Sequence, residues 1–209
     1  FVKRSTAKKG DLLCCSGDLG AAYIGLLFLE REKKIYLENP NIQPDLEGES
    51  YVIGRLLKPE ARKDIIEFFA ANAIIPTSMM DVSDGLSSEI LHICEQSSLG
   101  CVLYEEKIPI EEETKRAAFK FEIDPTACAL SGGEDYELLF TIDQKEYDKL
   151  VIARPVMEAG ENLGFLPGKA QEKVKPYMRP ILDALSYFIS PQEIQFMIHR
   201  EKIEIAPIA

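Results

Sequence analysis

The sequence predicts an α/β or mixed α+β fold, because short apolar runs of strand type alternate with longer stretches of helical spacing. With 209 residues, 46% of them hydrophobic and 28% charged, the chain has the composition of a globular protein of one large or two small domains. A net charge of −11 argues against a general binder of nucleic acids or anionic membranes.

The first expected unit is a strand, a glycine turn and a helix. The run DLLCC predicts the strand, and Asp18 is placed to cap a helix that continues to about Lys34. Residues 36–50 are polar and contain prolines and a glycine, which predicts a loop, or a loop between short helices. Another helix is expected after Pro59.

The second unit starts at residues 77–100, where a short strand-like run meets Ser83 and Asp84 and then apolar residues at helical spacing. CVLYEEKIPI predicts a strand, residues 111–120 a charged helix, and LLFTI a further strand before a helix capped by Asp143. From residue 151 the composition changes, with a buried-type strand, a glycine-rich loop, proline-interrupted helical stretches and the strand IEIAPIA.

Five cysteines form an odd set without metal-type spacing, so they are interpreted as reduced, small apolar side chains: Cys14, Cys15, Cys94, Cys101 and Cys128. No apolar stretch is long enough to cross a bilayer and no signal peptide is recognised, which predicts a cytoplasmic protein. The opening at Phe1 instead of Met suggests the middle of a longer protein.

The segment MMDVSDGL places Asp81, Ser83 and Asp84 where a strand ends and a helix begins. Carboxylates there can hold a hard cation such as Mg²⁺, while the serine hydroxyl and the first helical amides face a phosphate. A helix N-cap is the alternative for Ser83 and Asp84. It leaves Asp81 unexplained, because an unpaired carboxylate among apolar strand residues is costly.

The segment SGGEDYELLF repeats this pattern, with Gly132-Gly133 and Glu134-Asp135 at the entrance of a strand. A tight turn with solvated acids is the alternative. Two acidic, glycine-marked strand ends together favour a site for metal-assisted phosphoryl transfer, which needs several converging carboxylates. His92 and His199 are assigned structural or surface roles, and the chain has no Walker-type phosphate loop.

Several segments, in order, resemble thiamine-monophosphate kinase of the aminoimidazole ribonucleotide synthetase-like superfamily over about residues 1–148. They are RSTAKKGDLLCCSGDLGAAYIGL, KPEAR, MMDVSDGLSSEILHICEQSSLG, IPI and ALSGGEDYELLFTI. The resemblance implies Mg²⁺ at Asp81 and Asp84, ATP at Arg4 and Ser83, and thiamine monophosphate at Glu134.

The same resemblance implies direct transfer of the ATP γ-phosphoryl group to thiamine monophosphate, giving thiamine diphosphate, in a homodimeric enzyme. Residues 1–148 would then form mostly the C-terminal domain of the family's fold. The chain departs from the family pattern at Thr6 and in KPEAR, and it lacks the family's N-terminal acidic motifs and C-terminal tail. An incomplete metal cluster and a reduced rate are therefore expected.

Residues 150–209 resemble a fragment of the PhoH-like P-loop ATPase family and are expected to form a partial P-loop-type α/β segment. The fragment contains neither that family's phosphate loop nor its acidic Mg²⁺ motif, so no catalytic residue is assigned in it. Two alternatives to the kinase remain: a PhoH-like ATP-binding or ATPase module, and an inactive nucleotide-binding remnant.

Overall fold

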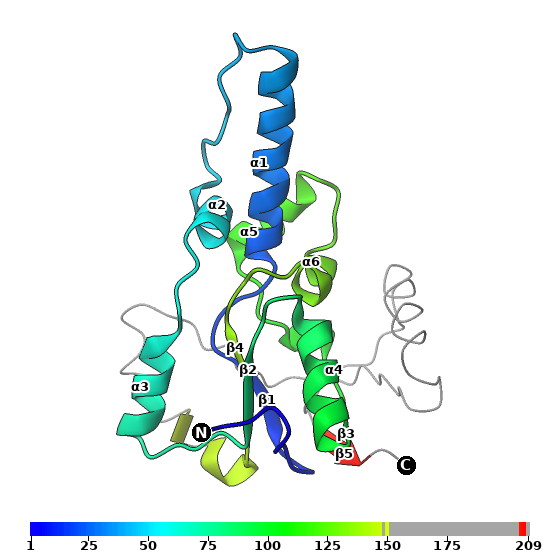
Figure 1. Cartoon of the computed structure of the whole chain (residues 1–209). Coiled ribbons are helices and arrows are strands. Elements are labelled where there is room, and N and C mark those ends of the chain that lie inside the picture. Colours follow the sequence, from blue (N-terminus) through cyan, green and yellow to red (C-terminus); the bar gives the residue numbers. More distant parts are fainter. Residues whose placement is uncertain (148, 151–204, 208–209) are drawn as a thin grey trace.

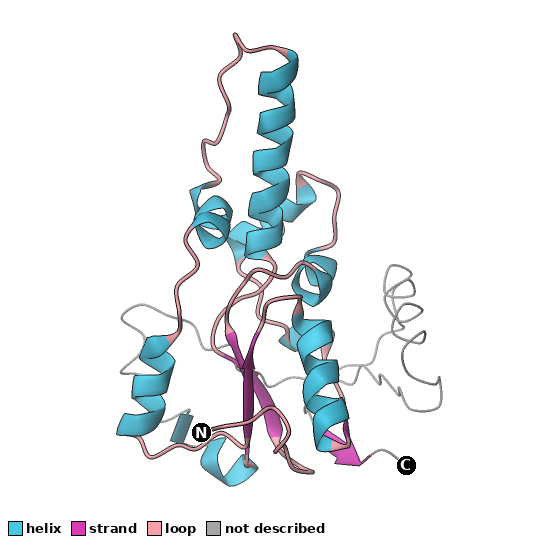
Figure 2. Ribbon diagram, viewed as in Figure 1, coloured by secondary structure: helices cyan, strands magenta, loops and turns pink. Residues whose placement is uncertain are grey.

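The structure is a computed structural model that describes residues 1–147, 149–150 and 205–207 (Figures 1 and 2). The strands are β1 (Leu12–Cys15), β2 (Ser78–Asp81), β3 (Leu99–Cys101), β4 (Leu138–Ile142) and β5 (Ile205–Pro207). The α-helices are α1 (Ala21–Glu38), α2 (Ser50–Leu57), α3 (Lys63–Ala71), α4 (Leu86–Ser97), α5 (Glu112–Phe119) and α6 (Pro125–Ser131). Short 3₁₀ turns lie at Glu105–Lys107 and Gln144–Glu146.

The main sheet has the strand order β1-β4-β2, and both neighbouring pairs are antiparallel. Its central strand, β4, is the apolar run LLFTI that follows the second acidic segment. A separate antiparallel pair joins β3 to β5. The predicted fold class is confirmed, and the antiparallel order makes it the mixed type.

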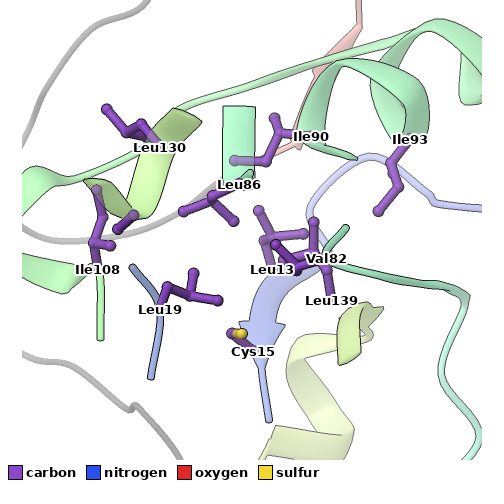
Figure 3. Packing of buried hydrophobic residues seen from close by; sticks show 11 residues of the cluster. Leu13, Cys15, Leu19, Val82, Leu86, Ile90, Ile93, Ile108, Leu130 and Leu139 are labelled. Atoms are coloured by element: carbon purple, nitrogen blue, oxygen red, sulfur yellow. The ribbon is translucent and has the colours of Figure 1, made fainter. Parts of the chain in front are cut away.

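Alternation along the strands divides the core between the two faces of this sheet. Leu13 and Leu139 face helix α4, where they pack with Ile90 and Ile93 (Figure 3). Their neighbour Phe140 faces the opposite way and packs against α3. This division follows from the two-residue period of a β-strand.

A third apolar cluster lies beyond the sheet, where α1 packs against α2 and α5. In Figure 1 the C-terminal half of α1 projects away from the sheet, and residues 39–49 return along it. Phe28 anchors the base of α1, with its ring 4.7 Å from that of Phe121 in an edge-to-face arrangement. Packing in this cluster holds the start of α1 close to the segment SGGEDYELLF.

Two sequence-based expectations about secondary structure were wrong. Helix α1 continues to Glu38, beyond the predicted end near Lys34, whereas α2 begins at Ser50, where the expected loop ends. Of the strand expected at CVLYEEKIPI, only Cys101 belongs to a strand, as the last residue of β3. The chain then turns at Glu105–Lys107 and buries Tyr104 and Ile108 in the core. The helical cap at Asp143 is confirmed, since its carboxylate accepts from the Lys145 amide at 2.9 Å.

The predicted partial P-loop-type segment lies outside the described residues, apart from β5. Strand β5 falls within the expected strand IEIAPIA. The stretches predicted between residues 151 and 204, including His199, lie outside the described part of the chain.

Candidate active site

The loop between β2 and α4 carries three of the five predicted site residues. Asp81 is the last residue of β2, and Ser83 and Asp84 precede the helix, which starts at Leu86. Asp81 and Asp84 are exposed and Ser83 is half-buried. The expectation that Asp81 is a costly buried carboxylate is therefore wrong, and its assignment as a ligand rests on position alone.

The segment from Gly133 to Tyr136 has an unusual backbone. Gly133, Glu134 and Tyr136 have φ angles of 70°, 63° and 53°. Residues other than glycine pay a steric penalty in this left-handed region, and such strain persists where surrounding contacts enforce it.

Those contacts come from the loop after β2. The Glu134 amide donates to the Ser83 carbonyl oxygen and the Tyr136 amide donates to the Val82 carbonyl oxygen, each at 2.8 Å. The structure thus brings Ser83, Asp84 and Glu134 together, as the sequence predicted from two segments about 50 residues apart.

Gly133 is required by this approach. A Cβ atom at Gly133 would lie 2.4 Å from the Ser83 carbonyl oxygen and 3.1 Å from the Asp84 Cα atom. Both neighbours are backbone atoms, so they cannot move aside cheaply. The glycine thus serves close backbone approach as well as positive φ.

We expect Gly133→Ala to lower the free energy of unfolding by about 1–2 kcal/mol more than Gly48→Ala does. Gly48 is a matched control, because its φ is 78° but a Cβ there would meet nothing within 4 Å. Chemical denaturation of both variants measures the difference. Equal losses would show that the contact between the two segments is not tight.

The exposed acids form a region of negative charge. The Tyr136 hydroxyl donates to Glu134 Oε2 at 3.1 Å, and this bond together with the charges of Glu134, Asp81 and Asp84 raises the pKa of Tyr136. In the described part of the chain, the side chains of Asp81 and Asp84 make no hydrogen bond or ion pair.

Two unpaired carboxylates fit Mg²⁺, which usually binds one or two carboxylates together with phosphate oxygens and water. Among the described residues, no set of three His, Cys, Asp or Glu side chains is arranged to hold a metal ion. Asp81 and Asp84 can therefore supply part of a coordination shell but not all of it.

Arg4 lies apart from these residues. Its Nε donates to Gln96 Oε1 at 3.0 Å, and its carbonyl oxygen accepts from the Ser97 hydroxyl at 3.4 Å. Because a helix rises about 1.5 Å per residue, Gln96 lies roughly 15 Å along α4 from Leu86. Arg4 and Ser83 can contact one ligand only if that ligand extends along the helix.

Asp135 caps α1, a role that the sequence assigned to Asp18. The Asp135 carboxylate accepts from the Gly20 amide at 2.8 Å and from the Ala22 amide at 3.3 Å. Burial raises the pKa of Asp135 to about 7, although these amides and Arg55 lower it. The prediction that Asp18 caps this helix was wrong, because the first amides of α1 donate to Asp135 instead.

Asp18 instead belongs to a buried charge network that sequence reasoning missed. It accepts from the Tyr51 hydroxyl at 2.8 Å, and Arg55 lies 3.8 Å away. Glu137, with 2% of its side chain exposed, pairs with Arg55 at 2.9 Å and with Arg62 at 2.5 Å. The only sequence signal was that Arg62 and Glu137 occur in KPEAR and GGEDYELLF, two of the segments that carry the resemblance to the kinase family.

This network lines one wall of an open pocket of about 540 Å³ between α2 and the loop before α3. Its guanidinium groups are already paired: Arg62 with Glu137 and Asp64, and Arg55 with Glu137 and Asp18. The network therefore holds α2 and this loop against Glu137, the residue that precedes β4.

No helix in the described residues is long and apolar enough to cross a membrane. His92 is half-buried within α4, at a position that agrees with the structural role predicted for it. The cysteines in the structure are unpaired, and Cys14, Cys15 and Cys128 are buried as expected.

The described domain has the fold of the aminoimidazole ribonucleotide synthetase-like class, with the candidate site at the strand ends. The structure of AaThiL complexed with AMPPCP and TMP shows this similarity, with a TM-score of 0.56 and 33% identity over 69% of this chain and 43% of that one.

Within that class, the resemblance to thiamine-monophosphate kinase is confirmed. The Aquifex aeolicus enzyme is 34% identical over 178 residues, which cover 84% of this chain and 53% of the relative. The chain thus spans about half the length of this curated relative.

The second resemblance is also confirmed. The family described as PhoH-like protein matches residues 139–209. A PhoH-like protein of Synechocystis is 55% identical over 64 residues, which cover 31% of this chain and 20% of the relative. The kinase and PhoH-like matches overlap in the chain, so the predicted boundary between residues 148 and 150 stays a prediction.

Proposed function

We propose that this chain carries part of the site of an ATP-dependent kinase that converts thiamine monophosphate to thiamine diphosphate. The observation that carries the proposal is the 2.8 Å hydrogen bond from the Glu134 amide to the Ser83 carbonyl oxygen. It sets the proposed substrate residue beside the proposed nucleotide residue. The similarity to the Aquifex aeolicus enzyme supplies the reaction and the substrates.

Each candidate residue has a defined role in this proposal. Asp81 and Asp84 bind Mg²⁺ through their unpaired carboxylates. The Ser83 hydroxyl, which in the structure donates over a long 3.4 Å to Glu89, rotates to donate to a phosphate oxygen of ATP. Glu134 contacts thiamine monophosphate, and Arg4 contacts the nucleotide at the other end of α4. Mg²⁺, when bound, neutralises charge on the phosphate oxygens during in-line transfer.

Helix α4 supports the phosphate in the same arrangement. Its first amides have no acceptor within the helix, and the positive end of the helix dipole lies at Leu86. A phosphoryl group between Ser83 and this helix start gains hydrogen bonds without a covalent enzyme intermediate. The chain's contribution to the reaction is therefore positioning and charge stabilisation.

The proposal extends to assembly and location. The enzyme would be a cytoplasmic homodimer, as the resemblance to the kinase family implies. Residues 1–148 would form the kinase-like domain and residues 150–209 a PhoH-like segment. Size-exclusion chromatography with light scattering tests the dimer.

The function is tested by incubating the purified 209-residue chain with ATP, MgCl₂ and thiamine monophosphate and measuring thiamine diphosphate. We expect product from the wild type and about a 100-fold or greater loss in Asp84→Ala, because one charge-stabilising group is removed. Glu95→Ala, an exposed change at the far end of α4, is the control.

Three outcomes contradict the proposal. If Asp84→Ala formed thiamine diphosphate as fast as wild type, the assignment of Asp84 to the site would be wrong. ATP hydrolysis without thiamine diphosphate would favour the PhoH-like module. Nucleotide binding without any turnover would favour an inactive remnant.

A further inference from the structure

Glu89 is a buried carboxylate on α4 that no step of the proposed reaction uses. Only 1% of its surface is exposed. Its Oε1 atom accepts from the Asp84 amide at 3.0 Å, from the Ser83 amide at 3.3 Å and from the Ser83 hydroxyl at 3.4 Å. Its Oε2 atom has no hydrogen-bond partner in the described part of the chain.

This arrangement is a poor one for stability alone. A buried carboxylate oxygen without a partner carries a desolvation cost, and apolar side chains of similar volume often replace buried charged groups without loss of stability. What an apolar residue at position 89 could not do is hold the two amides of Ser83 and Asp84. Hydrogen bonds to an ionised acceptor are the stronger kind, so they fix the loop more firmly than neutral ones.

The loop is thereby held from two opposite sides. The Ser83 and Asp84 amides donate to Glu89, while the Ser83 carbonyl oxygen accepts from the Glu134 amide. The peptide group between Ser83 and Asp84 thus links Glu89 to Glu134: its amide donates to Glu89 and its carbonyl oxygen accepts from the Glu134 amide.

We propose that Glu89 is a positioning residue that fixes the Ser83-Asp84 loop, so that the Ser83 hydroxyl and the Asp84 carboxylate are presented to nucleotide and metal. Glu89 acts through this loop and touches neither ligand. The ligands rest on the proposed function, whereas the fixing of the loop does not.

The fixing of the loop is tested by amide hydrogen exchange of the full chain, comparing wild type with Glu89→Met and Glu89→Gln. In Glu89→Met, exchange at the Ser83 and Asp84 amides should rise by about tenfold or more, because both lose their acceptor. Exchange in β4 and the denaturation midpoint should stay at wild-type values. Glu95→Met, an exposed change on the same helix, should leave the loop amides unaltered.

Two results would overturn the inference. One is unchanged protection of the Asp84 amide in Glu89→Met. The other is a uniform rise in exchange across the domain, which indicates general destabilisation. If Glu89→Met does not fold, Glu89→Gln decides, because its neutral amide oxygen is a weaker acceptor than the carboxylate. Faster exchange confined to the two loop amides, by less than about tenfold, supports the role, and uniform or absent change rejects it.

Mn²⁺ binding, measured by electron paramagnetic resonance, tests whether fixing the loop matters for the proposed metal site. We expect binding about tenfold weaker in Glu89→Met than in wild type, and lost in Asp84→Ala. If wild type binds no Mn²⁺, the proposed metal site fails while the exchange result still judges Glu89. If wild type binds Mn²⁺ and Glu89→Met binds it equally well, Glu89 does not position the loop for the metal.

Discussion

Glu137→Gln should lower the free energy of unfolding by about 3–5 kcal/mol, the range observed when one member of a buried ion pair is removed. Glu137 is the anion shared by Arg55 and Arg62, and it also accepts from the Ser16 hydroxyl at 2.5 Å. Glutamine has the size of glutamate but no charge, so the largely buried guanidinium groups of Arg55 and Arg62 lose the anion that they share. The remaining partners, Asp18 and Asp64, place the loss at the lower end of this range.

Denaturation with urea or heat measures this loss, and the melting temperature should fall by about 10 °C. Glu60→Gln is the matched control, because Glu60 also lines the pocket but pairs with Lys58 at 3.6 Å in solvent. An exposed pair of this kind contributes about 1 kcal/mol or less. Similar losses in the two variants would mean that the buried network does not hold α2 and β4 together.

The second large effect is a loss of stability with rising pH that depends on Asp135. Burial raises the pKa of Asp135 from 3.8 to about 7 in the folded chain. The folded state therefore binds this proton more tightly than the unfolded state does. The resulting stability is fully present below about pH 4 and is lost as the pH rises through 7.

Between pH 5 and 8, wild type should lose about 3 kcal/mol relative to Asp135→Asn, since each pH unit below the folded pKa is worth about 1.4 kcal/mol. The asparagine keeps an acceptor oxygen for the start of α1 but does not titrate. Chemical denaturation of both proteins at the two pH values isolates Asp135 from other carboxylates. Parallel pH profiles would show that Asp135 titrates normally and caps α1 as an ordinary anion.

Glu137 and Asp135 show why the prediction for SGGEDYELLF was incomplete. The pattern predicted a site at a strand entrance, and Glu134 lies at that site beside Ser83. The family resemblance singled out Glu134 as the substrate contact, but nothing in the pattern indicated the structural partners of Asp135 and Glu137. Glu134 is exposed, whereas Asp135 and Glu137 are buried and have structural partners on other elements.

Local patterns determined the elements that carry the site. The apolar run LLFTI is strand β4, and the helical spacing after Asp84 is α4, because each pattern reflects burial of one face of a single element. Gly133 marked a position of close backbone approach, because only glycine lacks the Cβ atom that would meet Ser83 there. Acidic residue types at two strand ends were enough to predict which loops meet.

Only the tertiary structure decided which acid does what. Asp135 accepts from the Gly20 amide at the start of α1, 115 residues earlier in the sequence, and Glu137 accepts from the Ser16 hydroxyl across 121 residues. Glu89 holds a loop five residues away, but its burial comes from the packing of α4 on the sheet. A buried carboxylate is stabilised by whichever donors folding brings to it, and those donors are not encoded in its sequence neighbours.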